Sequence, residues 1–214
     1  MKRAVLLLRA VNVGGTKVPM ADLRSLLEGL GLRDVRTYLQ SGNAVFDVDE
    51  TAAAAATTQE LAAAIETRIG RDIGPRVGAL VLEAGALATV AAANPFADAV
   101  GSERAGGAGV DPGWLHITFL FGGTGEADFG PASDEAFSDA YAAAYDKLSL
   151  SAVEGEQAVF AGLPALATPV VYLCLPHGYG RTKLNNAYFE RHLGAAATTR
   201  NWRTVQALVE MSAN

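Results

Sequence analysis

The pattern of apolar positions at the start of the chain predicts a strand, a helix and a hairpin. Residues 4–9 (AVLLLR) form an apolar run that is too short for a helix, which predicts a buried strand. Helical spacing follows over residues 20–30, after Pro19 at the first helical position. Residues 35–40 and 44–48 then predict two strands, which Ser41-Gly42-Asn43 joins as a turn.

The next segment repeats the alternation of helix and strand. Thr57-x-x-Glu60 is a capping box that predicts a helix ending at Gly70, and residues 76–82 predict a strand. The order so far is β-α-β-β-α-β, which is the ferredoxin-like split motif. A short helix over residues 84–93 is then expected before Asn94-Pro95.

A glycine-rich segment separates this half from a second one. Residues 96–113 contain GSERAGGAGVDPG, which is typical of a linker. The second half predicts, in order, a strand at 114–121, a glycine-rich loop at 122–131, a helix capped by Ser133, strands near 150–155, 157–161 and 170–175, and helices at 182–193 and 202–211. Thr182 and Asn201 are the expected caps of the last two helices.

We therefore expect an α+β fold with two α+β subdomains. The first, residues 1–95, is ferredoxin-like, residues 96–113 are a linker, and residues 114–214 form the second. The second half echoes β-α-β-β-α and is compatible with a diverged relative of the first, although no residue-level repeat demonstrates it.

The distribution of charge changes this picture more than the composition does. The formal net charge is −6, which argues against nonspecific binding to nucleic acid. Yet residues 1–43 carry a net charge of +4 and residues 177–214 one of +3, whereas residues 44–176 carry −13. Two basic ends on an acidic body create one positive cleft if the fold brings them together.

Other features bound the class of protein. The single cysteine, Cys174, excludes an intramolecular disulfide, and its apolar neighbours predict a buried thiol. The apolar run after Met1 is too short for a signal peptide, and prolines interrupt the uncharged stretch at 157–180. We expect a cytoplasmic protein without a membrane-spanning helix.

The segment RAVNVGGTKVP, residues 9–19, has the parts of an anion site. Two glycines allow backbone N–H groups to turn inward, and the start of the following helix adds a partial positive charge. The candidate ligand-binding residues here are Arg9, Asn12, Gly14, Gly15 and Lys17. A turn between a strand and a helix also needs glycine for steric reasons alone, so both interpretations stay open.

The segment HGYGRTKLNN, residues 177–186, is the second candidate. With Thr182 as the N-cap, Lys183 would lie in the first helical turn, where a cation opposes the helix dipole. A bound anion would explain Arg181 and Lys183 at such a position, with Asn185 as a further ligand-binding residue. The alternative is that both cations point into water or pair with the acidic body.

Two weaker candidates complete the set. In TTRNWRT, residues 198–204, Arg200 and Trp202 are candidate ligand-binding residues, although Trp202 could simply anchor the last helix. Ser41 and Asn43 are candidates in the predicted hairpin turn, which a structural role also explains fully.

Catalytic chemistry finds less support in the sequence. The histidines show no metal-ligand spacing, so no metal site is predicted. His116 fits a satisfied residue of a buried strand, and Ser41 has no nucleophile elbow around it. His177 is the one candidate general acid or base. No cofactor is indicated, and enzymatic activity stays open, with phosphoryl or acyl transfer as the natural use of such cations.

The motifs RAVNVGGTKVPMADLR, VRTYLQSGNAVF, NPF, GYGRTKLNN and TTRNWRTV together resemble the bacterial domain-of-unknown-function family 1697. The resemblance runs nearly from end to end and implies one unit built from two α+β subdomains. It implies no activity, but it makes the basic segments motifs of one family and so favours one shared site. The family usually has glycine in place of Ala10, and its loop before Val18 is often one residue longer.

We expect a protein that binds a small anionic ligand, such as a nucleotide or a phosphorylated metabolite, in a basic cleft between the subdomains. One alternative is a nucleic-acid-binding module, with Tyr38 as a stacking residue. The acidic body and the missing RNP-type aromatic pattern argue against it. Another alternative is a scaffold for protein interactions without a ligand. The sequence does not indicate an oligomeric state.

Overall fold

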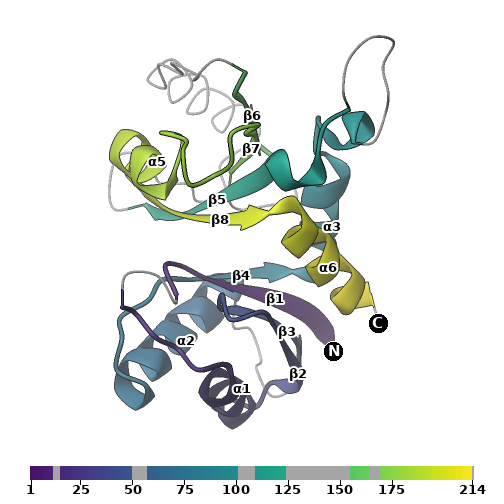
Figure 1. Cartoon of the computed structure of the whole chain (residues 1–214). Coiled ribbons are helices and arrows are strands. Elements are labelled where there is room, and N and C mark those ends of the chain that lie inside the picture. Colours follow the sequence, from purple (N-terminus) through teal and green to yellow (C-terminus); the bar gives the residue numbers. More distant parts are fainter. Residues whose placement is uncertain (12–14, 50–56, 101–108, 124–154, 164–168, 214) are drawn as a thin grey trace. The chain divides into compact units, whose positions relative to one another are not determined.

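A computed structural model of the chain describes residues 1–11, 15–49, 57–100, 109–123, 155–163 and 169–213 (Figure 1). The chain divides into two compact units. The first unit comprises Met1–Ala88 together with Ala207–Asn214, and the second unit comprises Thr89–Gln206. The ends of the predicted linker form 3-10 turns at Ala97–Ala99 and Pro112–Trp114.

The first unit has the predicted order β-α-β-β-α-β. Its elements are β1 (Lys2–Leu8), α1 (Met20–Gly29), β2 (Arg33–Tyr38), β3 (Asn43–Val48), α2 (Thr58–Asp72) and β4 (Ala79–Glu83), and α3 (Ala84–Ala92) follows them. The strands form one sheet in the order β2-β3-β1-β4, and each neighbouring pair is antiparallel. Because β1 and β2 both run antiparallel to β3, their carboxyl ends lie at the same edge of the sheet.

The capping box at the start of α2 is confirmed. The Thr57 hydroxyl accepts from the Glu60 N–H at 3.2 Å, and the Glu60 carboxylate accepts from the Thr57 N–H at 2.7 Å. The predicted end of this helix at Gly70 is wrong, because α2 continues to Asp72. A glycine ends a helix where the backbone turns left-handed, and here Gly74, with φ of 110°, takes that conformation.

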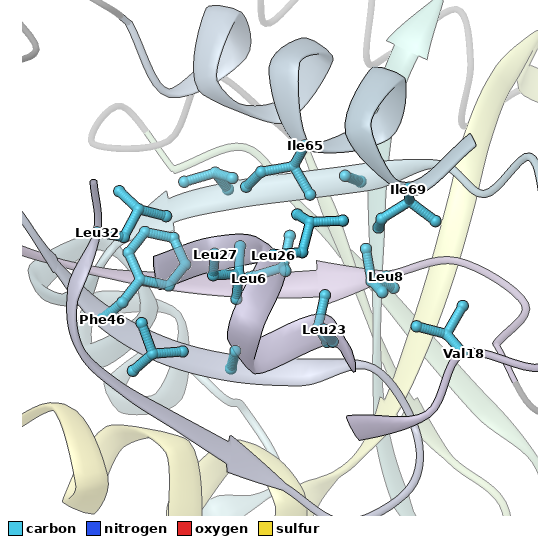
Figure 2. Close-up of a cluster of buried hydrophobic side chains, with 14 of the residues drawn as sticks. Leu6, Leu8, Val18, Leu23, Leu26, Leu27, Leu32, Phe46, Ile65 and Ile69 are labelled. Carbon is cyan, nitrogen blue, oxygen red and sulfur yellow. The ribbon is translucent and has the colours of Figure 1, made fainter. Parts of the chain in front are cut away.

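The core of the first unit lies between its sheet and the two helices α1 and α2. Figure 2 shows Leu6 and Leu8 of β1 and Phe46 of β3 directed toward Leu23, Leu26 and Leu27 of α1 and Ile65 and Ile69 of α2. These strand residues are spaced two apart, and the helix residues three or four apart, as one buried face of each element requires. The apolar spacing in the sequence therefore identified this core correctly.

The last helix, α6 (Trp202–Ala213), starts in the second unit and ends in the first. Within the first unit, Arg36 of β2 donates from Nη2 to the carbonyl of Met211 at 2.6 Å. The last carbonyls of a helix have no partner within the helix, and a cationic donor satisfies one of them favourably. Residues 207–213 are therefore attached to the first sheet by a contact between parts far apart in the sequence.

The second unit is built on a sheet with the same arrangement. Its described elements are β5 (Leu115–Gly123), β6 (Gln157–Ala161), β7 (Val170–Cys174), α5 (Asn186–Leu193) and β8 (Ala195–Asn201). The strand order is β6-β7-β5-β8 and all neighbouring pairs are antiparallel, so β5 to β8 take the places that β1 to β4 have in the first sheet. The predicted loop beyond residue 123, the helix capped by Ser133 and most of the strand near 150–155 lie outside the described residues.

Two sequence predictions in this unit are wrong. α5 begins at Asn186 rather than at Thr182, because Asn185 is the residue whose side chain accepts from a first-turn N–H, that of Tyr188, at 3.1 Å. The segment 195–201, to which the sequence analysis assigned no strand, is the strand β8. The prediction for Cys174 is confirmed, since the residue is buried in β7 and burial raises the pKa of its thiol.

Candidate functional site

The loop between β1 and α1 holds the first group of candidate residues. Arg9, Gly15 and Lys17 are described, whereas Asn12 and Gly14 lie outside the described residues. The Arg9 N–H donates to the Gly78 carbonyl at 2.7 Å, which fixes the point where the chain leaves β1. Lys17 is exposed, and its side chain makes no ion pair or hydrogen bond with the described part of the chain. This cation is therefore open to an anion from solution.

A surface depression of about 290 Å³ lies against this loop. The loop and the turn between β2 and β3 both contribute to its lining, which consists of Gly15, Thr16, Lys17, Val18, Pro19 and Gln40. Gly15 has φ of 95°, and a Cβ at this position would meet open space. The lining of the depression thus includes one basic side chain, Lys17, and one amide side chain, Gln40.

The helix that starts beside this depression has no side-chain cap. Pro19 is the N-cap residue of α1, and its side chain offers no acceptor to the first-turn N–H groups. The first helical hydrogen bond runs from the Leu23 N–H to the Pro19 carbonyl at 3.0 Å. α2 and α5, by contrast, are capped by Thr57 and Asn185. The start of α1 therefore lacks a side-chain cap, and Asp22 in its first turn is the acidic residue that offsets the partial positive charge there.

The turn between β2 and β3 has a clear structural role. Gly42, with φ of 72°, accepts the Leu8 N–H at 2.9 Å, and a Cβ on Gly42 would lie 2.6 Å from the Leu8 Cβ. Asn43 is fully buried and donates from Nδ2 to the Tyr38 carbonyl and to the Ser41 hydroxyl. These contacts fasten the turn to β1 and account for Gly42 and Asn43 without a ligand.

The segment before α5 carries the second group of candidates. Arg181 and Lys183 are exposed, while Thr182 and Leu184 between and after them are buried. The Thr182 hydroxyl accepts from the Leu184 N–H at 2.9 Å and donates to Oε2 of Glu156 at 2.9 Å. Lys183 therefore lies before the helix, and the unfavourable interaction with the helix dipole that the sequence suggested does not arise, since it assumed Thr182 as the cap.

Glu156 is a buried acid that the sequence analysis did not single out. Its residue is 5% exposed, and its second oxygen, Oε1, is buried and accepts no hydrogen bond from the described residues. A buried carboxylate is costly unless it is paired or hydrogen-bonded. Together with Thr182 it fixes the backbone from which Arg181 and Lys183 extend. No motif marks it, since one acid among many in the acidic middle of the chain gives no signal.

The second and third predicted motifs meet in the second unit. The Tyr179 hydroxyl donates to the Thr199 hydroxyl at 3.2 Å and accepts from the Asn186 N–H at 3.2 Å. Thr199 in turn donates to the side-chain oxygen of Asn186 at 2.7 Å and contacts the Thr118 hydroxyl at 2.8 Å. The network connects the segment before α5 to β8 and β5. The sequence missed Tyr179 and Thr199 because it did not predict β8.

Arg200 and Trp202, the candidates of the third motif, are both enclosed by the protein. Arg200 donates from Nη1 to the Thr198 hydroxyl at 2.7 Å and to the Thr199 carbonyl at 2.9 Å. Burial lowers the pKa of its guanidinium to about 10, so it is still protonated at neutral pH. Trp202 is 5% exposed and is the first residue of α6. Its position fits the anchoring role that the sequence analysis held as the alternative.

The histidines indicate no metal chemistry among the described residues. His116 stacks on Tyr179 with ring centroids 5.2 Å apart, its Nδ1 lies 3.2 Å from the Trp114 carbonyl, and burial lowers its pKa. Burial therefore favours the neutral form of this imidazole. His177 is exposed. Within the described ranges, no group of three or more potential metal ligands occurs, and no helix is long and apolar enough to cross a membrane.

Comparison with known proteins identifies the family of this chain and a solved structure with a similar fold. Residues 1–147 match the model of a family described as a protein of unknown function, DUF1697. The chain belongs to this family. The solved structure of the conserved bacterial protein SP0830 from Streptococcus pneumoniae is similar over 100% of this chain and 99% of that chain, with a TM-score of 0.61 and 24% identity. That likeness confirms the α+β fold with two subdomains. No curated protein matches.

Ala10 adopts a backbone conformation that is uncommon outside glycine. Ala10 has φ of 55°, in the left-handed region that glycine adopts freely and other residues adopt at a cost of about 1–2 kcal/mol. The strained residue lies directly after Arg9, at the start of the loop that leads to the depression.

Proposed function

We propose that this protein binds a small anionic molecule in the depression at the start of α1. The observation that carries the proposal is that an exposed lysine without a partner in the described chain, Lys17, lies at a depression where an uncapped helix begins. Backbone N–H groups at a helix start and a nearby cation are the two features that recur in phosphate sites. Gln40 supplies a neutral donor or acceptor at the same depression.

The ligand class follows from the size and charge of this surface. A depression of about 290 Å³ fits a small molecule rather than a polymer. One lysine and one helix start match a single phosphate or carboxylate group better than an extended polyanion. The net charge of −6 supports the same conclusion, because the rest of the chain repels nucleic acid.

The segment with Arg181 and Lys183 is a further part of the proposal, in the second unit. Both side chains are exposed and make no ion pair or hydrogen bond within the described part of the chain. Most arginines of the first unit, by contrast, have acidic or polar partners, such as Arg3 with Asp47 and Arg24 with Thr37. A pair of unpartnered cations on a segment that Thr182 holds in place supports a second anion contact.

The test of the first site is a titration with inorganic phosphate and methyl phosphate, followed by amide NMR shifts, on the wild type and on Lys17→Met. We expect saturable shifts at Gly15–Lys17 in the wild type and about tenfold weaker binding in the variant, which corresponds to about 1.4 kcal/mol for a charge-assisted hydrogen bond. Lys2→Met is the matched control, because Lys2 is an exposed lysine at the other end of β1, 3.5 Å from Glu83.

Two results would count against the proposal. If neither phosphate shifts the Gly15–Lys17 amides in the wild type, the depression is not an anion site. If Lys2→Met weakens binding as much as Lys17→Met does, the effect is one of net charge rather than of a site. The double variant Arg181→Ala/Lys183→Ala tests the second contact in the same titration, with the amides of residues 181–184 as its reporters.

A further inference from the structure

The last turn of α6, residues 210–213, receives its C-terminal cation from another element. No residue of this turn is basic, so the helix supplies no cation of its own to its last carbonyls. Arg36 of β2 supplies one, since its Nη2 donates to the Met211 carbonyl at 2.6 Å. The side chains of the turn are exposed or half-buried, whereas Leu208 just before it is fully buried. The contact with Arg36 therefore matters more for this turn than apolar packing does.

A shift of register in β2 aims Arg36 at this helix end. Side chains alternate along a regular strand, so residues three apart, such as Arg33 and Arg36, would face opposite sides of the sheet. The register shifts between them, and Arg33 pairs with Asp47 while Arg36 pairs with Val45. Phe46, between these two partners, points toward α1 and α2 (Figure 2). Both arginines therefore lie on the opposite face of the sheet, as a β-bulge allows.

Asp34, within the shifted segment, holds the guanidinium group of Arg36. Its backbone has φ of 47°, a left-handed conformation that residues other than glycine adopt at a cost. Its Oδ2 lies 3.4 Å from Nη2 of Arg36 and 3.1 Å from Nη2 of Arg3. The side chains of Asp34 and Arg36 are 48% and 35% exposed, so dissolved salt screens their attraction. The pair of Arg3 and Asp47 is more enclosed, at 21% and 19%, and is screened less.

The closed arrangement leaves hydrogen-bond donors unused. Nε of Arg36 and Nη1 of Arg3 are buried and have no acceptor in the part of the chain that the structure describes. A buried donor without an acceptor lowers the stability of the state that contains it. Withdrawal of the Met211 carbonyl would open the guanidinium of Arg36 to water and relieve part of this cost. The contact that holds the turn is thus opposed by a cost at the same side chain.

We propose that Asp34, Arg36 and the Met211 carbonyl form an ionic latch, which lets the last turn of α6 open locally as ionic strength rises while the first sheet stays folded. Asp34 is a positioning residue that acts through Arg36. Salt weakens the Asp34–Arg36 pair, the guanidinium loses its fixed orientation, and the population shifts toward the open turn. Opening stops before Leu208, because exposing this buried side chain costs apolar burial. The latch does not depend on the proposed anion site.

The test is amide hydrogen exchange, measured by NMR on the full chain. The amides of Met211–Ala213 report the turn, and those of Leu6 and Val45, in paired strands, report the sheet. Arg36→Met removes both the charge and the donor. We expect exchange in the turn to become about tenfold faster in this variant, because a hydrogen bond from a charged group is lost, while the sheet amides change by less than about twofold.

Two further variants separate the latch from general charge effects. Asp34→Asn keeps the left-handed conformation, which asparagine tolerates, and should speed exchange in the turn about threefold. Arg33→Met is the matched control, since Arg33 lies on the same strand and face, 3.7 Å from Asp49, and should leave the turn unchanged. From about 0.05 to about 1 M NaCl, exchange in the wild-type turn should rise about threefold, with no rise in Asp34→Asn or Arg36→Met.

Each of four results would overturn the latch. Unchanged exchange of the turn in Arg36→Met shows that the contact with Met211 does not hold it. Equal acceleration of the turn and the sheet shows that Arg36 stabilises the whole unit, so no local opening occurs. Wild-type exchange in Asp34→Asn removes the positioning role of Asp34. A salt response that persists in Arg36→Met assigns the sensitivity to other charges.

Discussion

Replacing Gly42 by alanine should destabilise the first unit more than any other single methyl group added in a turn of that unit. Alanine at φ of 72° costs about 1–2 kcal/mol in backbone strain. The new Cβ would also lie 2.6 Å from the Leu8 Cβ. Leu8 is 1% exposed and its N–H is bound to the Gly42 carbonyl, so neither partner can move away freely. Overpacking of this kind costs about 1–3 kcal/mol more.

Gly31→Ala isolates the steric part of this effect. Gly31 has φ of 83°, so alanine suffers similar backbone strain there, but nothing lies within 4 Å of the added Cβ. Both glycines belong to the first unit, so urea unfolding followed by circular dichroism reports the same transition for both. We expect Gly42→Ala to lose about 2 kcal/mol more than Gly31→Ala. A difference below about 0.5 kcal/mol would refute the view that close packing against Leu8 requires glycine in this turn.

Three further predictions concern single contacts. Ala10→Gly should stabilise the protein by about 0.5–1 kcal/mol in urea unfolding, since it relieves a left-handed alanine. The control Ala21→Gly, at an exposed position in α1, should destabilise it by a similar amount. A change of the same sign in both variants would contradict this prediction. Thr182→Val should lower the free energy of unfolding by about 3 kcal/mol, because the Glu156 carboxylate and the Leu184 N–H both lose their hydrogen bond to the hydroxyl. Thr182→Ser keeps the hydroxyl and should cost less than about 1 kcal/mol. Similar losses in the two variants would show that the hydroxyl does not contribute to stability. Hydrogen bonds from Arg71 and Arg68 lower the pKa of Asp72 to about 2. The contribution of Asp72 to stability is therefore present above about pH 4 and is lost as the pH falls toward about 2. Unfolding of Asp72→Asn should therefore depend less on pH in this window, and identical pH profiles of variant and wild type would exclude the effect.

Local signals in the sequence were sufficient where the local rule is strong. The capping box at Thr57 and Glu60 predicted the start of α2, because both hydrogen bonds connect residues three apart. The apolar spacing from Met20 to Leu30 likewise identified the buried face of α1. Cys174 was correctly placed in a buried strand by its apolar neighbours.

The sequence was insufficient where contacts between distant segments determine the bounds of an element. Thr182 looks like a helix cap, but its hydroxyl donates to Glu156 and accepts from the Leu184 N–H. The N-cap of α5 is therefore Asn185. The segment AAATTRN of β8 has weak apolar character, and it forms a strand because it pairs with β5 along its length. Gly194, with φ of 68° at the end of α5, was the local signal that could have separated the helix from this strand.

The same limit applies to the candidate site. The sequence named Lys17, Arg181 and Lys183 from their glycine-rich surroundings, and the structure shows all three exposed. It treated the turn from Gln40 to Asn43 only as a weak candidate, because the relevance of Gln40 depends on the adjacency of the β2–β3 turn to the β1–α1 loop. Two segments that are more than twenty residues apart form this depression, and no periodicity within either of them reports the other.

The attachment of residues 207–213 to the first sheet has a consequence for the order in which the protein is made. The first unit begins at Met1, but its last piece follows Ala88 by more than a hundred residues. During synthesis, the hydrogen bond from Arg36 to the Met211 carbonyl can therefore form only after the second unit has been translated. The first unit can build its sheet early, yet it reaches its final form only with the last turns of α6. A fragment that stops at Ala88 would lack the Met211 carbonyl to which Arg36 donates, and engineering of either unit should keep α6 intact.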